Sequence, residues 1–331
     1  MKAIVPVAGV GSRLRPHTFT KPKVLLNVAG KPILGHILDT LIASGVTRIS
    51  LIVGQMADLI EAYVRENYHV PVEFILQAEP RGLAHAVSLG LRKDDKDVLV
   101  ILGDTIFETD IKTLIESSCP TCIGVKTVED PRRFGVVETT DDGRVSRLVE
   151  KPEIPKSNLV IVGIYLVRNA PLLRTCIQTL FERQLTTRGE YQLTDALQLM
   201  IENGERITTF PVANWFDCGK PETLLATNRH LLDVLNGDVV EPRENALIVP
   251  PVYIHPKAIL ERAIVGPYAT IGAGAIVRDA MVRNSVLGEG AHVENALVAG
   301  SLVSNNSMIV GHFQRYNLGD SSEIASGPAT D

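Results

Sequence analysis

The sequence of 331 residues predicts an α/β fold with a mostly parallel sheet, followed by a smaller parallel β-helix. Two observations predict this combination. Up to about residue 235, apolar runs of strand length alternate with segments whose apolar residues recur every three or four positions, which is typical of strands covered by helices on both faces. The hexads "VGPYAT", "IGAGAI" and "VRDAMV" run consecutively from Val265, and an aliphatic residue, often followed by Gly, recurs about every six positions, which is typical of a β-helix.

The first half of the α/β region contains the clearest strand and helix patterns. Parallel strands are expected to be joined by right-handed crossovers, and sheets of this kind bind ligands at the carboxyl ends of their strands. The expected strands are 3–7, 48–54, 72–77, 98–104 and 121–128, and the expected helices are 33–43, 56–68 and 83–91.

The pattern is more mixed after residue 128. The stretch 135–152 is typical of a hairpin, with "DDG" as its turn, and 190–204 has helical spacing. Roughly 60 residues of hexads would give about three coils of a β-helix. A small β-sandwich is the alternative, which the consecutive hexads disfavour. The predicted boundaries are a first domain at 1–235, a linker at 236–248, the β-helix at 249–320 and a flexible tail at 321–331.

Composition sets limits on partners and location. The net charge of −5 gives no reason to expect a nucleic-acid or membrane surface, and no apolar run approaches the roughly 20 residues that span a bilayer. The N-terminus has no signal-peptide pattern, so we expect a cytoplasmic protein. Cys119 and Cys122 have the spacing of a redox pair or half a zinc site, but no second close pair completes a site, and the pair precedes a strand. We therefore interpret them as two reduced thiols.

The stretch "VAGVGSRLRPHTFTKPK", residues 7–23, directly follows the first strand. Gly9 and Gly11 permit backbone conformations in which successive N–H groups converge on an anion. Several cations follow, among them Arg13 and Lys23, and the intervening prolines favour a stiff loop. The pattern has neither the spacing of a P-loop nor the helix start of a dinucleotide fingerprint. It favours a site for a highly charged polyphosphate; a basic surface loop is the alternative.

Two isolated acids add to this hypothesis. Asp104 ends the run "VLVILGD" at the edge where ligands bind, and Asp217 stands beside a glycine turn in "NWFDCGKPETLL". Carboxylates at such positions are natural Mg²⁺ ligands, although both could instead cap helices. Glu150 and Lys151 stand side by side after a strand, where a solvated turn is the alternative. Together these residues would supply a metal site and phosphate-binding cations.

Eight motifs occur in a characteristic order over most of residues 1–232. They are "AGVGSRLRP…KPK", "QAEPRGLAHAV", "LGDTIF", "DPRRFGVVE", "EKPEIPKSN", "VGIYL", "RGEYQLTDAL" and "WFDCGKPETLL". The set resembles the sugar-1-phosphate nucleotidylyltransferases, most closely the glucose-1-phosphate thymidylyltransferase group, whose long form carries a C-terminal left-handed β-helix. The chain departs from the family pattern at Val10, where a second glycine is usual, and at Ser12, where threonine is usual.

The resemblance implies a Rossmann-like nucleotidyltransferase domain and a reaction. An oxygen of a sugar-1-phosphate attacks the α-phosphorus of a nucleoside triphosphate in line, and pyrophosphate leaves without a covalent enzyme intermediate. Catalysis would consist of positioning and charge neutralisation, with Mg²⁺ as cofactor. The expected substrates are glucose-1-phosphate and either dTTP or UTP, since thymine and uracil differ by one methyl group.

The resemblance also implies residue roles. Arg13 would hold the triphosphate, and Lys23 would contact phosphates. Asp104 and Asp217 would bind Mg²⁺. The implied nucleotide-binding residues are Ala8, Gly9, Gly11, Ser12, Arg13, Gln77, Gly82 and Asp104, with Gln77 and the Gly82 backbone at the pyrimidine edge. The implied sugar-phosphate-binding residues are Gly135, Glu150, Lys151 and Val162, with Lys151 on the phosphate and Glu150 on sugar hydroxyls.

Three histidines and three other functions are alternatives to this interpretation. His17, His36 and His85 receive no role, because the attacking phosphate oxygen is already ionised. The alternatives are a mannose-1-phosphate guanylyltransferase, an acetyltransferase in the β-helix, and a regulatory subunit that binds nucleotide sugars without catalysis. The β-helix is short and has no long acceptor loop, and all five phosphate and metal residues are present, which disfavours the last two. We expect the β-helix to serve assembly of a homo-oligomer.

Overall fold

A computed structural model describes residues 1–235, 243–312 and 318–322. The chain divides into two compact units, residues 1–238 and 239–331, and each is described here by itself. Most of the predicted linker, residues 236–242, and most of the predicted tail, residues 323–331, lie outside the described residues.

The first unit consists of thirteen strands and seven α-helices with three short 3₁₀ turns between them, counted over its described residues. The strands are β1 Lys2–Pro6, β2 Asn27–Val28, β3 Lys31–Pro32, β4 Arg48–Val53, β5 Val72–Leu76, β6 Val98–Ile101, β7 Thr105–Glu108, β8 Thr121–Thr127, β9 Gly135–Thr139, β10 Val145–Glu150, β11 Leu159–Val167, β12 Ile207–Pro211 and β13 Asn214–Asp217. The helices are α1 Ile33–Ala43, α2 Ala57–Asn67, α3 Leu83–Gly90, α4 Ile111–Glu116, α5 Ala170–Glu182, α6 Leu193–Glu202 and α7 Pro221–Leu235, and the 3₁₀ turns are η1 Ser12–Leu14, η2 Lys23–Leu25 and η3 Pro131–Arg133.

The central sheet has nine strands and is parallel where the sequence predicts it. Strands β6, β1, β4 and β5 are neighbours in that order and run parallel. On the other side of β6 the sheet becomes mixed, because β11 is antiparallel to β6, β8 and β9. The predicted run 98–104 forms a shorter strand than expected. β6 ends at Ile101, and the Gly103 N–H instead donates to the carbonyl oxygen of Pro6 beyond it.

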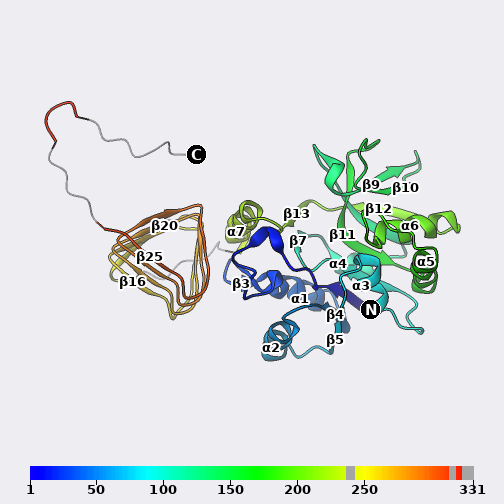
Figure 1. Cartoon of the computed structure of the whole chain (residues 1–331), viewed down its shortest axis with the longest axis horizontal. Coiled ribbons are helices and arrows are strands. Elements are labelled where there is room, and N and C mark those ends of the chain that lie inside the picture. Colours follow the sequence, from blue (N-terminus) through cyan, green and yellow to red (C-terminus); the bar gives the residue numbers. More distant parts are fainter. Residues whose placement is uncertain (236–242, 313–317, 323–331) are drawn as a thin grey trace. The chain divides into compact units, whose positions relative to one another are not determined.

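Both faces of the sheet are covered, as the continuous apolar runs predict. Ala3, Ile4 and Val5 are consecutive in β1 and all 0 % exposed, although successive side chains of a strand point to opposite faces. Helix α3 packs on β1 and β4, and α5 packs beside α6 (Figure 1). Burial on both faces is the main source of stability in such a layered unit.

A separate two-stranded ribbon, β7 with β13, continues from the end of β6. The strands are antiparallel, and Asp217 pairs with Thr105 at one end while Asn214 pairs with Glu108 at the other. The Cys218 N–H donates to the carbonyl oxygen of Asp104, which extends the pairing beyond the ribbon. Although Asp104 and Asp217 are far apart in sequence, this pairing brings them to the same end of the ribbon.

The remaining predicted elements of this unit are also present. Strands β9 and β10 form the hairpin expected in 135–152, and Gly143 in its turn has a φ of 78°. The expected helix in 190–204 is α6. All four cysteines are free thiols, and Cys122 lies at the start of β8 with its Sγ 3.3 Å from Sγ of Cys119. Both cysteines lie near the start of β8, as predicted, and the reduced state of their thiols stays a prediction.

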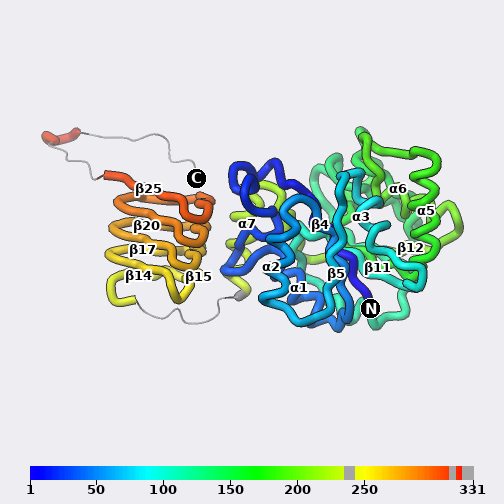
Figure 2. The backbone as a smooth tube through the Cα atoms, turned by 60° about the horizontal axis from the view of Figure 1, so that its bottom comes forward, coloured from blue at the N-terminus to red at the C-terminus, as the bar shows by residue number. Residues whose placement is uncertain are grey.

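The second unit is a stack of short parallel strands. They are β14 Ala246–Ile248, β15 Val252–Ile254, β16 Ile259–Glu261, β17 Ala263–Val265, β18 Ala269–Ile271, β19 Ile276–Arg278, β20 Met281–Arg283, β21 Val286–Leu287, β22 His292–Glu294, β23 Leu297–Ala299, β24 Leu302–Val303 and β25 Met308–Val310. Every third strand along the chain joins the same sheet, and each of the three sheets holds four strands. Figure 2 shows β14, β17 and β20 in successive coils.

This stack has the architecture of the predicted left-handed β-helix. Its core is lined by aliphatic residues spaced five or six apart, among them Val265, Ile271 and Val277, each 0 % exposed. The sheets contain four strands each rather than the three coils expected, because successive coils are offset by only 16 or 17 residues. Strand β14 pairs with β17 but falls inside the interval 236–248 that the sequence assigned to a linker. Among the described residues, no helix is both long and apolar enough to cross a membrane.

Candidate active site

The loop after β1 is folded tightly against the end of the sheet. Gly11 has a φ of 66°, and its carbonyl oxygen accepts a hydrogen bond from Oγ1 of Thr18. A Cβ on Gly11 would lie 2.9 Å from Cβ of Lys23, so only glycine fits both the conformation and the space. The loop contains the short turns η1 and η2 rather than being irregular throughout. It thereby brings Lys23 back beside the strand ends.

Lys23 makes an ion pair with Asp104. The Nζ atom lies 2.7 Å from Oδ2 of the carboxylate. The lysine side chain is only 7 % exposed, whereas that of Asp104 is 41 % exposed. Because the cation lies behind and the carboxylate in front, the pair holds an acid at the open edge of the sheet.

Asp217 and Arg13 lie next to each other at the same edge. A Cβ built on Gly219 would be 2.8 Å from Oδ1 of Asp217 and 3.1 Å from Nη2 of Arg13, so both side chains crowd around this glycine. Burial and the negative charge of Asp104 raise the pKa of Asp217, while Lys23 and Arg13 lower it. The negative charge of Asp104 thus disfavours the ionised form of Asp217, and the two nearby cations favour it.

A cavity of about 400 Å³ opens beside these residues. Arg13 and Asp217 line it together with residues that the sequence reasoning did not assign, which are Arg133, Phe134, Trp215, Phe216, Lys220, Thr223 and Ala226. Four of them, Trp215, Phe216, Lys220 and Thr223, belong to the motif "NWFDCGKPETLL", of which only Asp217 was assigned a role. The "DPRRFG" motif contained Arg133 and Phe134, but the arginines there look like ordinary surface charges in sequence.

Aromatic rings and cations share the walls of this cavity. The rings of Phe134 and Trp215 meet edge to face with centroids 5.2 Å apart. Nε1 of Trp215 is buried, with no acceptor among the described residues. Arg13, Arg133 and Lys220 outnumber the one carboxylate, Asp217. The cavity therefore suits a ligand that combines anionic charge with a hydrogen-bonding, partly apolar body.

Gln77 and Gly82 lie together at the end of β5. The Gln77 N–H donates to the carbonyl oxygen of Val53, which places the residue just beyond the last rung of the sheet. Its side chain is 8 % exposed, and Nε2 lies 3.3 Å from the Gly82 carbonyl oxygen. The pair predicted to contact one nucleobase is therefore in mutual contact.

Three of the predicted sugar-phosphate residues form a second group. Gly135 and Glu150 are register partners in the hairpin, and Lys151 Nζ lies 3.0 Å from Oε1 of Glu150. The other carboxylate oxygen of Glu150 accepts a hydrogen bond from Oγ1 of Thr194. Arg188, which the sequence reasoning did not assign, donates to the carbonyl oxygen of Lys151.

Val162 is positioned differently from the rest of this group. Its side chain is 1 % exposed and packs over Gly124 in the sheet. It therefore has no free surface for a ligand, and only its backbone remains available for the predicted contact.

The strand order determines the order of the predicted site residues along the carboxyl-terminal edge of the sheet. Asp104 follows β6, Ala8 follows β1, and Gln77 follows β5, with β4 between the last two. A Cβ on Gly54, at the end of β4, would lie 2.7 Å from the carbonyl oxygen of Ala8, so the loop closes over that strand. Neighbouring strands are about 4.8 Å apart, so three steps from β6 to β5 span about 14 Å. That is the scale of an extended nucleoside triphosphate.

The two acids fit the ligand set of Mg²⁺. Magnesium is usually held by one or two carboxylates together with substrate phosphates and water, rather than by a cage of protein ligands. Asp104 and Asp217 supply such a pair, and the pKa of Asp217 is raised by burial and by the charge of Asp104, which a dication would offset. No group of three or more metal-ligating side chains occurs in the parts of the chain that the structure describes.

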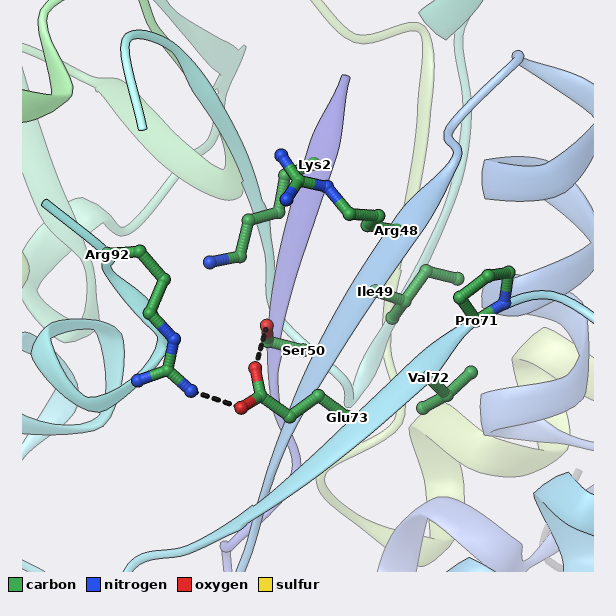
Figure 3. Close-up of a pocket in the computed structure, with 8 residues that line it drawn as sticks. All are labelled: Lys2, Arg48, Ile49, Ser50, Pro71, Val72, Glu73 and Arg92. Carbon is green, nitrogen blue, oxygen red and sulfur yellow. Dashed lines mark hydrogen bonds and ion pairs between the residues drawn. The ribbon is translucent and has the colours of Figure 1, made fainter. Parts of the chain in front are cut away.

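Another cavity, of about 290 Å³, lies at the opposite, amino-terminal edge of the sheet (Figure 3). Glu73 there accepts hydrogen bonds from Arg92 and from Ser50. Lys2 is buried and paired with Asp95 at 2.9 Å. The charged residues of this cavity are therefore largely paired with one another or with other protein groups. Parallel sheets, moreover, bind ligands at the opposite, carboxyl-terminal edge. The carboxyl edge is therefore the candidate active site.

Comparison with known proteins finds similarity over most of the chain. The family model described as nucleotidyl transferase matches residues 2–234. The chain is 32 % identical to the glucose-1-phosphate thymidylyltransferase of Streptomyces antibioticus, covering 98 % of this chain and 99 % of that protein. It is 35 % identical to the UTP–glucose-1-phosphate uridylyltransferase of Haloferax volcanii, covering 67 % and 93 %.

Two further matches define the extent of the similarity. The chain is 36 % identical to the low-salt glycan biosynthesis nucleotidyltransferase of Haloferax volcanii, over 70 % of this chain, and it spans 66 % of that protein. The crystal structure of UDP-glucose pyrophosphorylase complexed with UDP-glucose matches with a TM-score of 0.62 and 23 % identity, covering 70 % of this chain and 98 % of that one. The structural match bears on the fold of the first unit.

Proposed function

Because the chain belongs to the nucleotidyl transferase family, we propose that it transfers a nucleotidyl group from dTTP or UTP to a sugar-1-phosphate, and that the sugar is glucose. Pyrophosphate is the second product. The observation that carries this proposal is the grouping of Lys23, Asp104, Arg13 and Asp217 at one edge of the sheet, beside a cationic and aromatic cavity. The relatives named thymidylyltransferase and uridylyltransferase support the choice of substrates.

The reaction needs positioning and charge neutralisation more than proton transfer. The phosphate oxygen of the sugar-1-phosphate is ionised at neutral pH and attacks the α-phosphorus directly, while negative charge builds on the departing pyrophosphate. Arg13 would bind that charge from the loop after β1, and Lys23 would hold both Asp104 and a phosphate oxygen. Asp104 and Asp217 would hold Mg²⁺, which would supply positive charge to neutralise the phosphates.

The two ends of the site would hold the two substrates. Gln77 and the Gly82 backbone would contact the base three strands away from Asp104. Lys151 would grip the sugar phosphate, and Glu150 would accept hydrogen bonds from sugar hydroxyls, since its side chain is nearly buried and already oriented by Thr194. Orientation of both substrates in this way can supply a large part of the rate enhancement.

Pyrophosphate release tests this proposal. The full chain would be incubated with Mg²⁺, glucose-1-phosphate and each of dTTP, UTP, GTP, ATP and CTP in turn. Release with dTTP or UTP, together with formation of the nucleotide sugar, is the expected result. Release only with GTP and mannose-1-phosphate would support the guanylyltransferase instead, and tight binding of a nucleotide sugar without turnover would support a regulatory subunit.

A further inference from the structure

The side-chain amide of Gln77 is held in one orientation by two neighbours. Its nitrogen Nε2 lies 3.3 Å from the carbonyl oxygen of Gly82 and 3.0 Å from Nδ1 of His85. A carbonyl oxygen can only accept hydrogen bonds, so the amide nitrogen, and not the amide oxygen, must face Gly82. The other N–H of the same nitrogen then donates to Nδ1 of His85. Both amide hydrogens are thereby used inside the protein.

His85 can accept this hydrogen bond only as a neutral ring with its proton on Nε2. Burial and the nearby Arg81 lower the pKa of His85, and Glu79 raises it. The ring of Phe181 lies 6.0 Å from the imidazole and meets it edge to face. These surroundings favour the neutral form at pH 7, in which Nδ1 is an acceptor.

The remaining polar atom of Gln77 is its oxygen, Oε1. Among the residues that the structure describes, no donor contacts this atom. The buried side-chain polar atoms without a partner are Asn27 Oδ1 and Trp215 Nε1, so Oε1 is reached by solvent. A nearly buried glutamine thus presents one lone acceptor at the carboxyl edge of β5.

A single hydrogen-bond acceptor distinguishes bases by whether the ring nitrogen at their pairing edge carries a hydrogen. Uracil and thymine carry a hydrogen on N3 at the pairing edge, and guanine carries one on N1. Cytosine and adenine present a bare lone pair at the corresponding position, which would face Oε1 as acceptor against acceptor. A site built around one hydrogen-bonding atom rejects a ligand that leaves this atom unpaired or repelled.

We propose that His85 is a positioning residue that sets base specificity. By accepting from Nε2, it turns Oε1 of Gln77 toward the nucleotide, so the site takes bases with a ring N–H at the pairing edge and rejects cytosine and adenine. This inference rests on the proposed function, because it presumes that the base lies at Gln77.

The test compares kcat/KM for UTP with kcat/KM for CTP, at saturating glucose-1-phosphate, in three proteins. The wild type is expected to favour UTP by a factor of roughly 10³ or more. His85→Phe keeps a ring that can pack on Phe181 but has no acceptor, so the amide can rotate and the ratio is expected to fall at least about tenfold. His85→Asn offers Oδ1 close to the position of Nδ1 and is expected to keep the ratio within about threefold.

A matched control separates specificity from stability. Ser88, one turn further along α3, donates to the His85 carbonyl oxygen, and the side-chain hydrogen bonds of Gln77 go to other residues. Ser88→Ala, and any purely structural defect, should lower kcat/KM for UTP and CTP by the same factor and leave their ratio unchanged. An unchanged ratio in His85→Phe overturns the inference, as does a wild type that uses CTP as well as UTP.

Failure of the proposed function has a different signature. It would appear as no pyrophosphate release from any nucleoside triphosphate in the wild type. The dissociation constants of UTP and CTP, measured by calorimetry without sugar phosphate, then decide the inference. A wild-type preference for UTP that His85→Phe loses supports it, and equal constants in the wild type overturn it.

Discussion

Nζ of Lys23 lies 2.7 Å from Oδ2 of Asp104, and this ion pair joins the loop after β1 to the residue that follows β6. The lysine is nearly buried under that loop, and the carboxylate is partly open. The ammonium group of Lys23 therefore orients the Asp104 carboxylate and leaves it open to solvent. The pair therefore links the shape of the glycine loop to the proposed metal and phosphate site.

Removal of the Lys23 charge should impair turnover more than folding. Lys23→Met keeps most of the buried stem but leaves Asp104 without its partner and the phosphates without a cation, so kcat/KM for UTP is expected to fall at least about 10²-fold. Lys112→Met, on the exposed face of α4, is the matched control and should retain full activity. Wild-type turnover in Lys23→Met would remove this lysine from the site.

Each of the two acids should be required for turnover. Asp104→Asn and Asp217→Asn keep the shape of the side chain but remove a negative oxygen ligand, and each is expected to lower kcat at least about 10²-fold. Direct titration with Mn²⁺, followed by electron paramagnetic resonance, should show weaker binding in both. The exposed Asp58→Asn on α2 serves as the control. If either site variant binds and turns over like the wild type, its metal assignment is wrong.

The buried ion pair at the amino-terminal edge should contribute to the free energy of unfolding and not to turnover. Lys2 and Asp95 are 2.9 Å apart with side chains 6 % and 2 % exposed, and Lys2 also donates to the Gly90 carbonyl oxygen. Asp95→Asn leaves a buried cation uncompensated and is expected to destabilise the first unit by about 3–5 kcal/mol in urea unfolding. Glu61→Gln, which breaks an exposed pair with Arg65, should cost no more than about 0.5 kcal/mol. Equal costs would show that Asp95 is not held as described.

Stability of the first unit should fall as the pH falls below the ordinary range of histidine. Burial is the main cause that lowers the pKa of His36, whose Nε2 contacts the Val28 carbonyl oxygen. A lowered pKa in the folded state means that the unfolded chain binds the proton first, so the free energy of unfolding decreases as the pH falls through 6.5. Urea unfolding at pH 7.5 and pH 5.5 measures this decrease. His36→Gln should show a smaller decrease than the wild type, and an identical one would exclude His36 as a source.

Much of the fold could be predicted because its patterns are local. Helix α1 covers the residues 33–43 that apolar spacing indicated, and β1, β4 and β5 lie within a residue or two of the predicted runs. The hexads likewise specified a β-helix, since each coil repeats the same short-range pattern. The edge at which a ligand would bind also follows from sequence, because parallel strands have their carboxyl ends on one side.

The composition of the site, in contrast, depends on pairings between distant segments. Trp215 and Phe216 meet Arg133 only because β13 pairs with β7 and η3 lies near that ribbon, and no local pattern encodes either contact. The side chain of Val162 packs on Gly124 and is buried. The sequence motif around Val162 did not indicate this packing.

His85 illustrates the same division most clearly. Its sequence neighbourhood is an ordinary helix start, and the chemistry of phosphate attack gives it no role. Whether it can orient Gln77 depends on a loop reversal between β5 and α3 that brings two side chains within hydrogen-bond distance. The sequence alone determined the elements and the kinds of charge at their ends, since those follow from short-range periodicity. Tertiary structure alone decided which of these groups touch, because hydrogen bonds and ion pairs act only over a few ångströms.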